Sequence, residues 1–126
     1  MYKNISGIDI FWKYFPDKPW HYFHDILEFR WYKEFDYTEW CDRTYVELKM
    51  SDLNGLDIVL FKLIDASGEG IYKLNGWISG LDILNLRYGA TWIEEQYELI
   101  DFEENNLHFY CNEIEIKVIA VNGKDI

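Results

Sequence analysis

Hydrophobic and polar residues alternate with a period of two along much of this chain, and this alternation limits the folds open to it. ILEFRWYKEF, residues 26–35, has one apolar face that only Lys33 interrupts. That face carries Leu27, Phe29, Trp31 and Phe35. TYVELKM, residues 44–50, shows the same alternation. Strict alternation is typical of a β-strand with one buried face, so we expect strands in both segments.

Turn residues separate these strands from further candidates. Residues 57–65, DIVLFKLID, are almost continuously apolar, which suits a central strand covered on both faces. The pair Asn54-Gly55 precedes this run and predicts a β-hairpin with a type I′ turn, because both residues tolerate a positive φ. Residues 65–70, DASGEG, are mostly small or polar and predict a turn.

The C-terminal half continues the β pattern. Residues 71–78 and 80–89 are expected to be strands, although the second also fits helical spacing. A second hairpin is expected across residues 104–106. Within residues 107–121, the apolar positions change from odd to even numbers, which would turn every later side chain to the opposite face. A β-bulge or tight turn near residues 111–113 would restore the inward face.

Composition and length complete the fold prediction. The chain has 126 residues, of which 49% are hydrophobic and 19% aromatic, and this excludes a disordered chain. We expect a single domain over residues 1–126. About six to eight short strands predict an all-β fold, mainly antiparallel, as a sandwich or barrel. A short helix or turn near the N-terminus is compatible with this fold.

The chain is strongly acidic, with 23 Asp and Glu against 12 Lys and Arg and a formal net charge of −11. Phosphate backbones and anionic membranes would be repelled, so direct nucleic-acid binding and membrane binding are disfavoured. A basic protein partner would be attracted, although the acidity also serves simply to keep an aromatic-rich domain in solution. An exposed strand edge would in addition permit a homodimer.

Two features of the sequence indicate a location. No apolar run reaches the roughly 18 residues that a membrane-spanning helix needs. The N-terminal segment lacks the uninterrupted apolar core of a signal peptide. We therefore expect a cytoplasmic protein. In that reducing compartment Cys41 and Cys111, which form no CxxC motif, are expected to be free thiols.

His21, His24 and Asp25 lie close together in an aromatic stretch and raise the question of a metal or acid–base site. On a helix the three would share a face, and a zinc site would be conceivable. On a strand the two histidines point to opposite faces. Pro16 and Pro19 come just before and an alternating segment just after, so we expect the start of a strand. Asp25 would then accept hydrogen bonds from nearby backbone N–H groups, and His24 would bond the same turn.

Other groups of reactive side chains carry little information. His108 and Cys111 are three residues apart in an expected strand and face opposite sides, so they form no nucleophilic pair. Adjacent carboxylates such as Glu103-Glu104 diverge on a strand. The sequence has no GxSxG elbow and no phosphate-binding loop. We therefore expect no enzyme, no catalytic residue, no bound metal and no cofactor.

The segment FDYTEWCD, residues 35–42, is a candidate interaction site. It mixes aromatic residues with three acids, as an interface anchor inside a charged rim does. A second loop near residues 92–95 has a similar composition. The expected partner-binding residues are Asp36, Tyr37, Glu39, Trp40 and Asp42 in the first loop and Trp92, Glu94 and Glu95 in the second. A plain solvated hairpin loop is the alternative for the first segment.

Three stretches together resemble a known family. They are Phe23-His24-Asp25 at the start of the first clear strand, GLDILNL at residues 80–86, and LHFYCNEIEIKV at residues 107–118. The chain is similar over residues 20–120 to the immunity protein 50 family of bacterial polymorphic-toxin systems. Its F-H-D triplet and its closing phenylalanine-x-cysteine followed by alternating aliphatics correspond here to Phe23, His24, Asp25, Phe109, Cys111, Ile114 and Ile116.

The resemblance implies a cytoplasmic protein that binds and neutralises a cognate toxin domain, with no catalytic residue. Many toxin domains are basic nucleases, and an acidic inhibitor can occupy a site built for phosphate. Two alternatives stay open. One is a small metal-binding or hydrolytic β-domain that uses His21, His24 and Asp25. The other is a carbohydrate-binding module that uses exposed aromatic rings.

Overall fold

The computed structural model describes residues 4–71, 77–86 and 95–126, and it shows the predicted all-β fold with a short N-terminal helix. No helix in the described part of the chain is long and apolar enough to cross a membrane. The helical elements are α1 (Ile8–Tyr14) and the 3₁₀ turn η1 (Trp20–Tyr22). The strands are β1 (Ile5–Ser6), β2 (Asp25–Asp36), β3 (Cys41–Ser51), β4 (Ile58–Ile64), β5 (Ser67–Ile71), β6 (Leu81–Asn85), β7 (Tyr97–Asp101), β8 (Leu107–Cys111), β9 (Glu113–Val121) and β10 (Lys124–Asp125).

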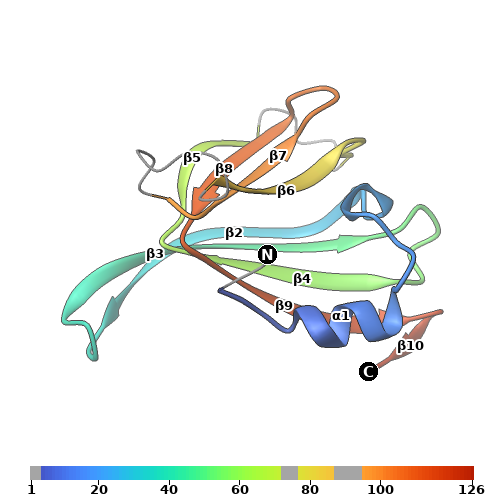
Figure 1. Cartoon of the computed structure of the whole chain (residues 1–126), viewed down its shortest axis with the longest axis horizontal. Coiled ribbons are helices and arrows are strands. Elements are labelled where there is room, and N and C mark those ends of the chain that lie inside the picture. The colour runs from blue at the N-terminus through green and yellow to red at the C-terminus, as the bar shows by residue number, and fades with distance from the viewer. Residues whose placement is uncertain (1–3, 72–76, 87–94) are drawn as a thin grey trace.

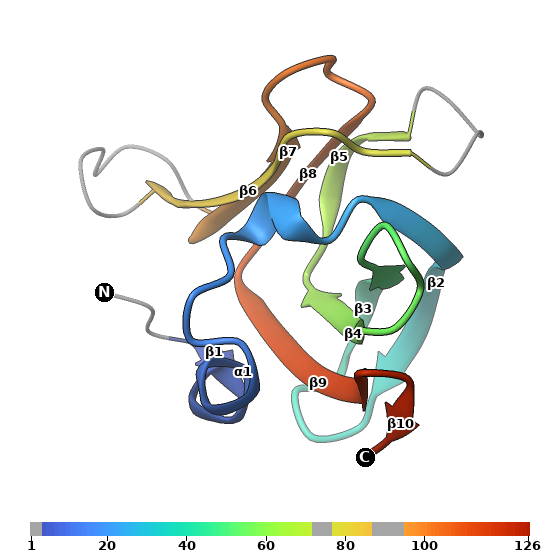
Figure 2. The same cartoon turned by 90° about the vertical axis from the view of Figure 1, so that its right-hand side faces the viewer.

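The strands form two sheets that pack around one hydrophobic core. The larger sheet has the order β1-β9-β4-β3-β2, and β10 also pairs with β9. The smaller sheet has the order β5-β8-β7-β6. All pairs are antiparallel except β1 with β9. The larger sheet is curved, and the smaller one lies over it (Figures 1 and 2). The arrangement is therefore sandwich-like.

The predicted alternation places the core. In β3 the side chains of Val46, Leu48 and Met50 are fully buried, whereas Glu47 and Lys49 point to the other face. The smaller sheet buries one face in the same way, through Leu81, Ile83, Tyr97, Leu99, Leu107, Phe109 and Cys111. Burial of these alternating apolar side chains is the main favourable contribution to folding.

The N-terminal segment closes one end of the core. Phe11, on the buried face of α1, has its ring centroid 5.3, 4.9 and 5.8 Å from those of Phe15, Trp20 and Phe23. Just before the helix, Gly7 has a φ of +82°, and a Cβ there would lie 2.0 Å from a backbone carbonyl oxygen of β9. Only glycine fits this position, because any side chain would be strained by the positive φ and would clash with that carbonyl oxygen.

The change of phase in the last segment is a change of sheet. Strand β8 ends at Cys111 in the smaller sheet, and β9 begins at Glu113 in the larger one. Asn112 lies between them and donates its backbone N–H to the Ile64 carbonyl, 3.0 Å away, at the end of β4. Since each sheet faces the core from its own side, the one-residue shift keeps both apolar faces inward. In place of the predicted β-bulge or tight turn near residues 111–113, the chain makes a bend at Asn112 and changes sheet.

Three local predictions are wrong or fall outside the described residues. The hairpin at Asn54-Gly55 exists, but its loop runs from residue 52 to 57, and of the two residues only Gly55 has a positive φ, so the turn is not type I′. The DASGEG segment is not only a turn, because β5 begins within it at Ser67. Most of the strand predicted at 71–78 lies outside the described residues.

Candidate functional site

The β2–β3 hairpin projects beyond the larger sheet. Strands β2 and β3 have 12 and 11 residues, and β4 has seven. The β3–β4 pairing runs only from Tyr45 to Ser51 of β3, so β2 is the only strand among the described residues that pairs with the first four residues of β3. Figure 1 shows this end of the hairpin leaving the body of the molecule at the lower left. The segment predicted to bind a partner forms the end of this projection.

One carboxylate organises the turn at the end of the hairpin. Asp36 is the last residue of β2, and its Oδ1 accepts hydrogen bonds from the backbone N–H groups of Thr38 at 2.9 Å and Glu39 at 3.2 Å. These backbone bonds, that of Glu39 above all, hold the pKa of the Asp36 carboxyl below its usual value. The other oxygen, Oδ2, lies 3.3 Å from Nη1 of Arg43.

Arg43 connects this turn to the junction of the two sheets. Its Nε and Nη2 donate to Oδ1 and Oδ2 of Asp65 at 3.0 and 2.7 Å, which is a bidentate ion pair. Asp65 also accepts a 3.4 Å hydrogen bond from Nδ2 of Asn112, where the chain changes sheets. The Arg43 hydrogen bond is the largest cause of the lowered pKa of Asp65. The projecting hairpin is thereby fixed to the core at its base.

Three aromatic rings contact one another at the end of the hairpin, and we call Phe35, Tyr37 and Trp40 the aromatic tip. The centroid of Phe35 lies 4.9 Å from that of Tyr37 and 5.3 Å from that of Trp40, and the last two are 6.2 Å apart. Tyr37 is 77% exposed, Trp40 74% and Phe35 40%. Rings that pack edge to face in this way hold each other in place while most of their surface stays in solvent.

Acidic groups surround the aromatic tip. Glu34, Glu39 and Asp42 are exposed there, and they carry three negative charges. Of the nearby cations, Arg43 is already paired with Asp36 and Asp65. The tip is therefore an exposed apolar patch with an excess of negative charge at its rim. This chemistry suits a basic protein surface rather than a phosphate backbone.

The structure brings five of the eight predicted partner-binding residues together in this hairpin, namely Asp36, Tyr37, Glu39, Trp40 and Asp42. Asp36 has a structural role there, because both of its oxygens are bonded within the hairpin. Glu95 does not join them, because it precedes β7 of the smaller sheet and acts electrostatically on Tyr110. Trp92 and Glu94 lie outside the described residues.

Two members of the site are not among the predicted partner-binding residues. Phe35 belongs to the apolar face of the strand as well as to the segment 35–42, and it ends in solvent because it pairs with the exposed Asp42, beyond the buried residues of β3. Arg43 was overlooked because its main partner, Asp65, is 22 residues away. For Phe35, the available signal was that the apolar alternation of the strand continues to the residue directly before the turn.

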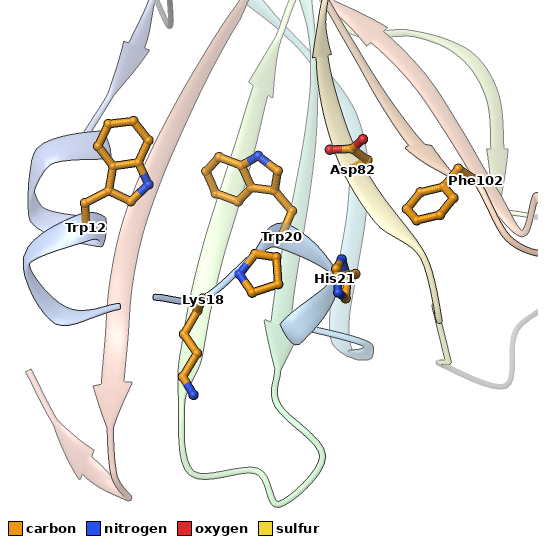
Figure 3. A pocket seen from close by; sticks show the side chains of 7 residues that line it. Trp12, Lys18, Trp20, His21, Asp82 and Phe102 are labelled. Atoms are coloured by element: carbon orange, nitrogen blue, oxygen red, sulfur yellow. The ribbon is translucent and has the colours of Figure 1, made fainter. Parts of the chain in front are cut away.

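A second site, which we call the aromatic cleft, lies between the N-terminal segment and the smaller sheet (Figure 3). Its volume is about 360 Å³, within the range of small-ligand sites. It is lined by Trp12, Lys18, Pro19, Trp20, His21, Asp82 and Phe102. Trp20 is almost buried, whereas the rings of Trp12 and Phe102 are about half exposed. The ammonium of Lys18 lies 4.5 Å from the ring centroid of Tyr22.

The candidate metal or acid–base residues His21, His24 and Asp25 do not form a site. Phe23 is fully buried, His21 lines the aromatic cleft, and the His24 ring lies 4.4 Å from that of Trp77. Nε2 of His24 is buried with no hydrogen-bond partner among the described residues, so this nitrogen makes no bond to a turn. Asp25 starts β2, as predicted, but its carboxylate accepts no hydrogen bond within that part of the chain.

No three His, Cys, Asp or Glu side chains in residues 4–71, 77–86 and 95–126 gather in a way that could hold a metal ion. The nearest approach to a reactive cluster is His108, whose Nε2 lies 2.5 Å from Oε2 of Glu98, with a Glu69 oxygen 4.0 Å from Nδ1. Cys111 lies in the core on the opposite face of β8, and Cys41 is exposed; both are free thiols. The expected separation of His108 from Cys111 is confirmed.

No family model, no curated protein sequence and no solved structure matches the chain. The resemblance to immunity protein 50 therefore stays a prediction.

Proposed function

We propose that this chain is a cytoplasmic immunity-type protein that binds a basic toxin domain and neutralises it by steric and electrostatic occlusion. The observation that carries the proposal is the aromatic tip, which presents Tyr37 and Trp40 in solvent at the end of a projecting hairpin. Trp and Tyr are the residues that most often dominate the energy of protein interfaces. Exposed rings that pack on one another at such a position are better explained by a partner than by the stability of the chain.

Charge supports a basic partner. The net charge of −11 produces a negative field that would speed association with a cationic domain, and the acids beside the aromatic tip would face that domain directly. A nuclease toxin has a cationic surface for phosphate, so an acidic inhibitor is complementary to it. This agrees with what the resemblance to immunity proteins implies, and the proposal assigns no catalytic residue.

The first experiment is an affinity purification with the tagged protein from its native host at low salt, followed by mass spectrometry. We expect one stoichiometric basic toxin domain that is released at high salt. The affinity of the purified domain is then measured by calorimetry for the wild type and for Tyr37→Ala/Trp40→Ala. Loss of two interface anchors is expected to weaken binding at least about 100-fold.

Leu53→Ala is the matched control, because Leu53 is 64% exposed in the loop between β3 and β4, outside the aromatic tip. Its affinity is expected to equal that of the wild type. Unchanged binding by the tip variant would show that the toxin contacts another surface. A captured domain that keeps its full toxic activity in the complex would contradict the inhibitory function itself.

A second candidate function follows from the aromatic cleft. Sugar rings stack on exposed Trp side chains and bond to nearby carboxylates and imidazoles, and Trp12, Asp82 and His21 supply these groups in one cleft. A carbohydrate-binding module would show a change in Trp fluorescence on titration with glycans, and Trp12→Ala would abolish it. Unchanged fluorescence across a glycan panel would leave the cleft without this function.

A further inference from the structure

Strand β2 is a long edge strand. It pairs with β3 on one side, and on the other side the described residues provide only a single bridge, between Asp25 and Trp77, at its start. Figure 2 shows β2 at the outer edge of the curved sheet. From Glu28 to Asp36 the backbone N–H and C=O groups of this edge have no strand partner in the described part of the chain. An edge of this length is a template for another strand.

We propose that two copies of the chain pair through these edges, antiparallel, about a twofold axis that passes beside Tyr32. The twelve-residue β2 would then join two six-stranded sheets into one continuous sheet. In this register Arg30 of each copy lies opposite Glu34 of the other, and Phe29 lies opposite Phe35. The inference goes beyond the toxin-binding proposal, with which it shares Glu34 and Phe35, and it rests mainly on the backbone edge and side chains of β2.

Charge complementarity on the outer face favours this register. The Arg30 side chain is 63% exposed, and its own ion pair with Glu47 is long, at 3.5 Å. Glu34 lies opposite Arg43 in the hairpin register, yet Arg43 turns to Asp36 and Asp65 instead. Glu34 therefore makes no ion pair with any described residue. Two cross-strand Arg30–Glu34 pairs, related by the twofold axis, would supply the missing partner.

The inner face gives the same register. Phe29 and Trp31 keep 37% and 45% of their surface exposed, and Lys33 interrupts the apolar row. With the axis at Tyr32, each Lys33 faces Trp31 of the other copy, which is a favourable cation–π arrangement. An inward-pointing lysine ordinarily protects an edge from pairing. Here it would select one register instead of blocking all of them.

Neighbouring registers bring like charges together. Moving the axis by one residue toward the hairpin end places Lys33 opposite Lys33, and moving it the other way places Glu28 opposite Glu34. In the Tyr32 register the only like-charge pair is Glu28 with Asp36 at the ends. Each of these carboxylates already has a cation in its own chain, Lys49 at 3.9 Å and Arg43 at 3.3 Å.

Sedimentation velocity on the full chain tests the proposal with two single variants, Arg30→Glu and Glu34→Arg. The wild type is expected to be a dimer at about 100 μM, and each variant to dimerise at least about tenfold more weakly, because each places like charges opposite one another. An equimolar mixture of the two variants is expected to form heterodimers with the affinity of the wild type, since every pair is then complementary. Chains that had simply misfolded would not recover on mixing.

Glu113→Arg and Lys117→Glu are the matched controls, because they change exposed charges on β9 at the far side of the same sheet. Both are expected to dimerise like the wild type. A wild type that sediments as a monomer at about 100 μM overturns the proposal. So does dimerisation of the single variants at the strength of the wild type, or a mixture that stays as weakly associated as its components.

Discussion

Two hairpins of this protein are built around the same turn and use it differently. Asp36 ends β2, and Asp101 ends β7. Each accepts hydrogen bonds from the backbone N–H groups two and three residues later. Four residues after each aspartate the chain takes a positive φ, 56° at Trp40 and 54° at Asn105. The local geometry is repeated, so the differences between the hairpins reflect their surroundings.

The carboxylate that organises the β7–β8 turn lies in the core, although residues 102–105 of the turn are exposed. Asp101 is fully buried, and besides the two turn bonds its carboxylate accepts the backbone N–H groups of Gly80 at 3.1 Å and Asn106 at 3.2 Å. It therefore joins β6 to the hairpin. Asp36 has only the two turn bonds and an ion pair with Arg43, in a loop exposed to solvent. One turn stabilises the fold, and the other presents three aromatic rings.

Thiol chemistry provides the largest contrast between the hairpins. Cys41 begins β3 in the exposed hairpin, whereas Cys111 ends β8 in the core, where burial raises the pKa of its thiol to about 12. We expect a disulfide reagent to label Cys41 of the native protein more than about a thousandfold faster than Cys111, which needs an opening of the core. Mass spectrometry of timed samples measures both rates. Comparable rates would show that the smaller sheet opens easily and would remove the contrast.

Substitution of the two aspartates compares the turns in terms of folding stability. Asp101→Asn replaces a buried acceptor of four backbone N–H groups by an amide that accepts with one oxygen only, so the free energy of unfolding is expected to fall by about 3 kcal/mol. Asp36→Asn is the matched control and should lower it much less, because its turn is exposed. Urea denaturation followed by circular dichroism measures both. An equal loss in the two variants would mean that the turns contribute alike.

Arg43→Lys tests the connection between the exposed hairpin and the core. Lysine cannot reproduce the bidentate bond to Asp65, so we expect a loss of about 1 kcal/mol of unfolding free energy near pH 7. Asp65 has a lowered pKa in the folded protein, so its contribution is present above its usual value of 3.8 and is lost as the pH falls through the lowered value. Urea titrations should therefore show the difference between the two proteins shrinking as the pH falls below 3.8 and Asp65 becomes protonated. A difference that stays constant as the protein is acidified would exclude this ion pair as the cause.

The strands that the alternation predicted are those whose side chains divide cleanly between core and solvent. The buried apolar residues are odd-numbered in β8 and even-numbered in β9, because the two strands belong to different sheets. The chain changes sheet between them, at Asn112. Strand β5 could not be predicted in this way. Its glycines are typical of a turn. The strand depends instead on tertiary contacts, because the Trp31 side chain lies so close to Gly70 that a Cβ there would be 3.3 Å from it.

The candidate sites likewise divide into features that the sequence predicts and features that it does not. The composition of residues 35–42 predicted an exposed aromatic loop, because acids beside large rings have no place in a core. The ion pair that anchors this loop joins Arg43 to Asp65, and no local pattern connects them. The aromatic cleft draws its residues from α1, from η1 with the segment before it, and from the smaller sheet, so its existence depends on how these parts pack. Sequence periodicity carries no information on which distant elements pack together.

Trp40→Asn tests whether the β2–β3 turn is less stable because it presents a tryptophan to a partner. A bulky residue with a positive φ costs about 1 kcal/mol, and asparagine, which the β7–β8 turn has at the equivalent Asn105, adopts this conformation readily. The gain is partly offset by lost contacts of Trp40 with Phe35 and Tyr37. We expect the free energy of unfolding to stay unchanged or rise by up to about 1 kcal/mol, while partner affinity falls at least about tenfold.

The reciprocal change, Asn105→Trp, supplies the control. It should destabilise the protein by about 1 kcal/mol, because the strain enters a turn that gains nothing from an aromatic ring. Both variants are measured by urea denaturation beside the wild type. If Trp40→Asn instead lost more than about 1 kcal/mol, the tryptophan would be required by the hairpin itself. The strain at Trp40 would then have a structural reason, and the comparison of the two turns would no longer indicate a binding surface.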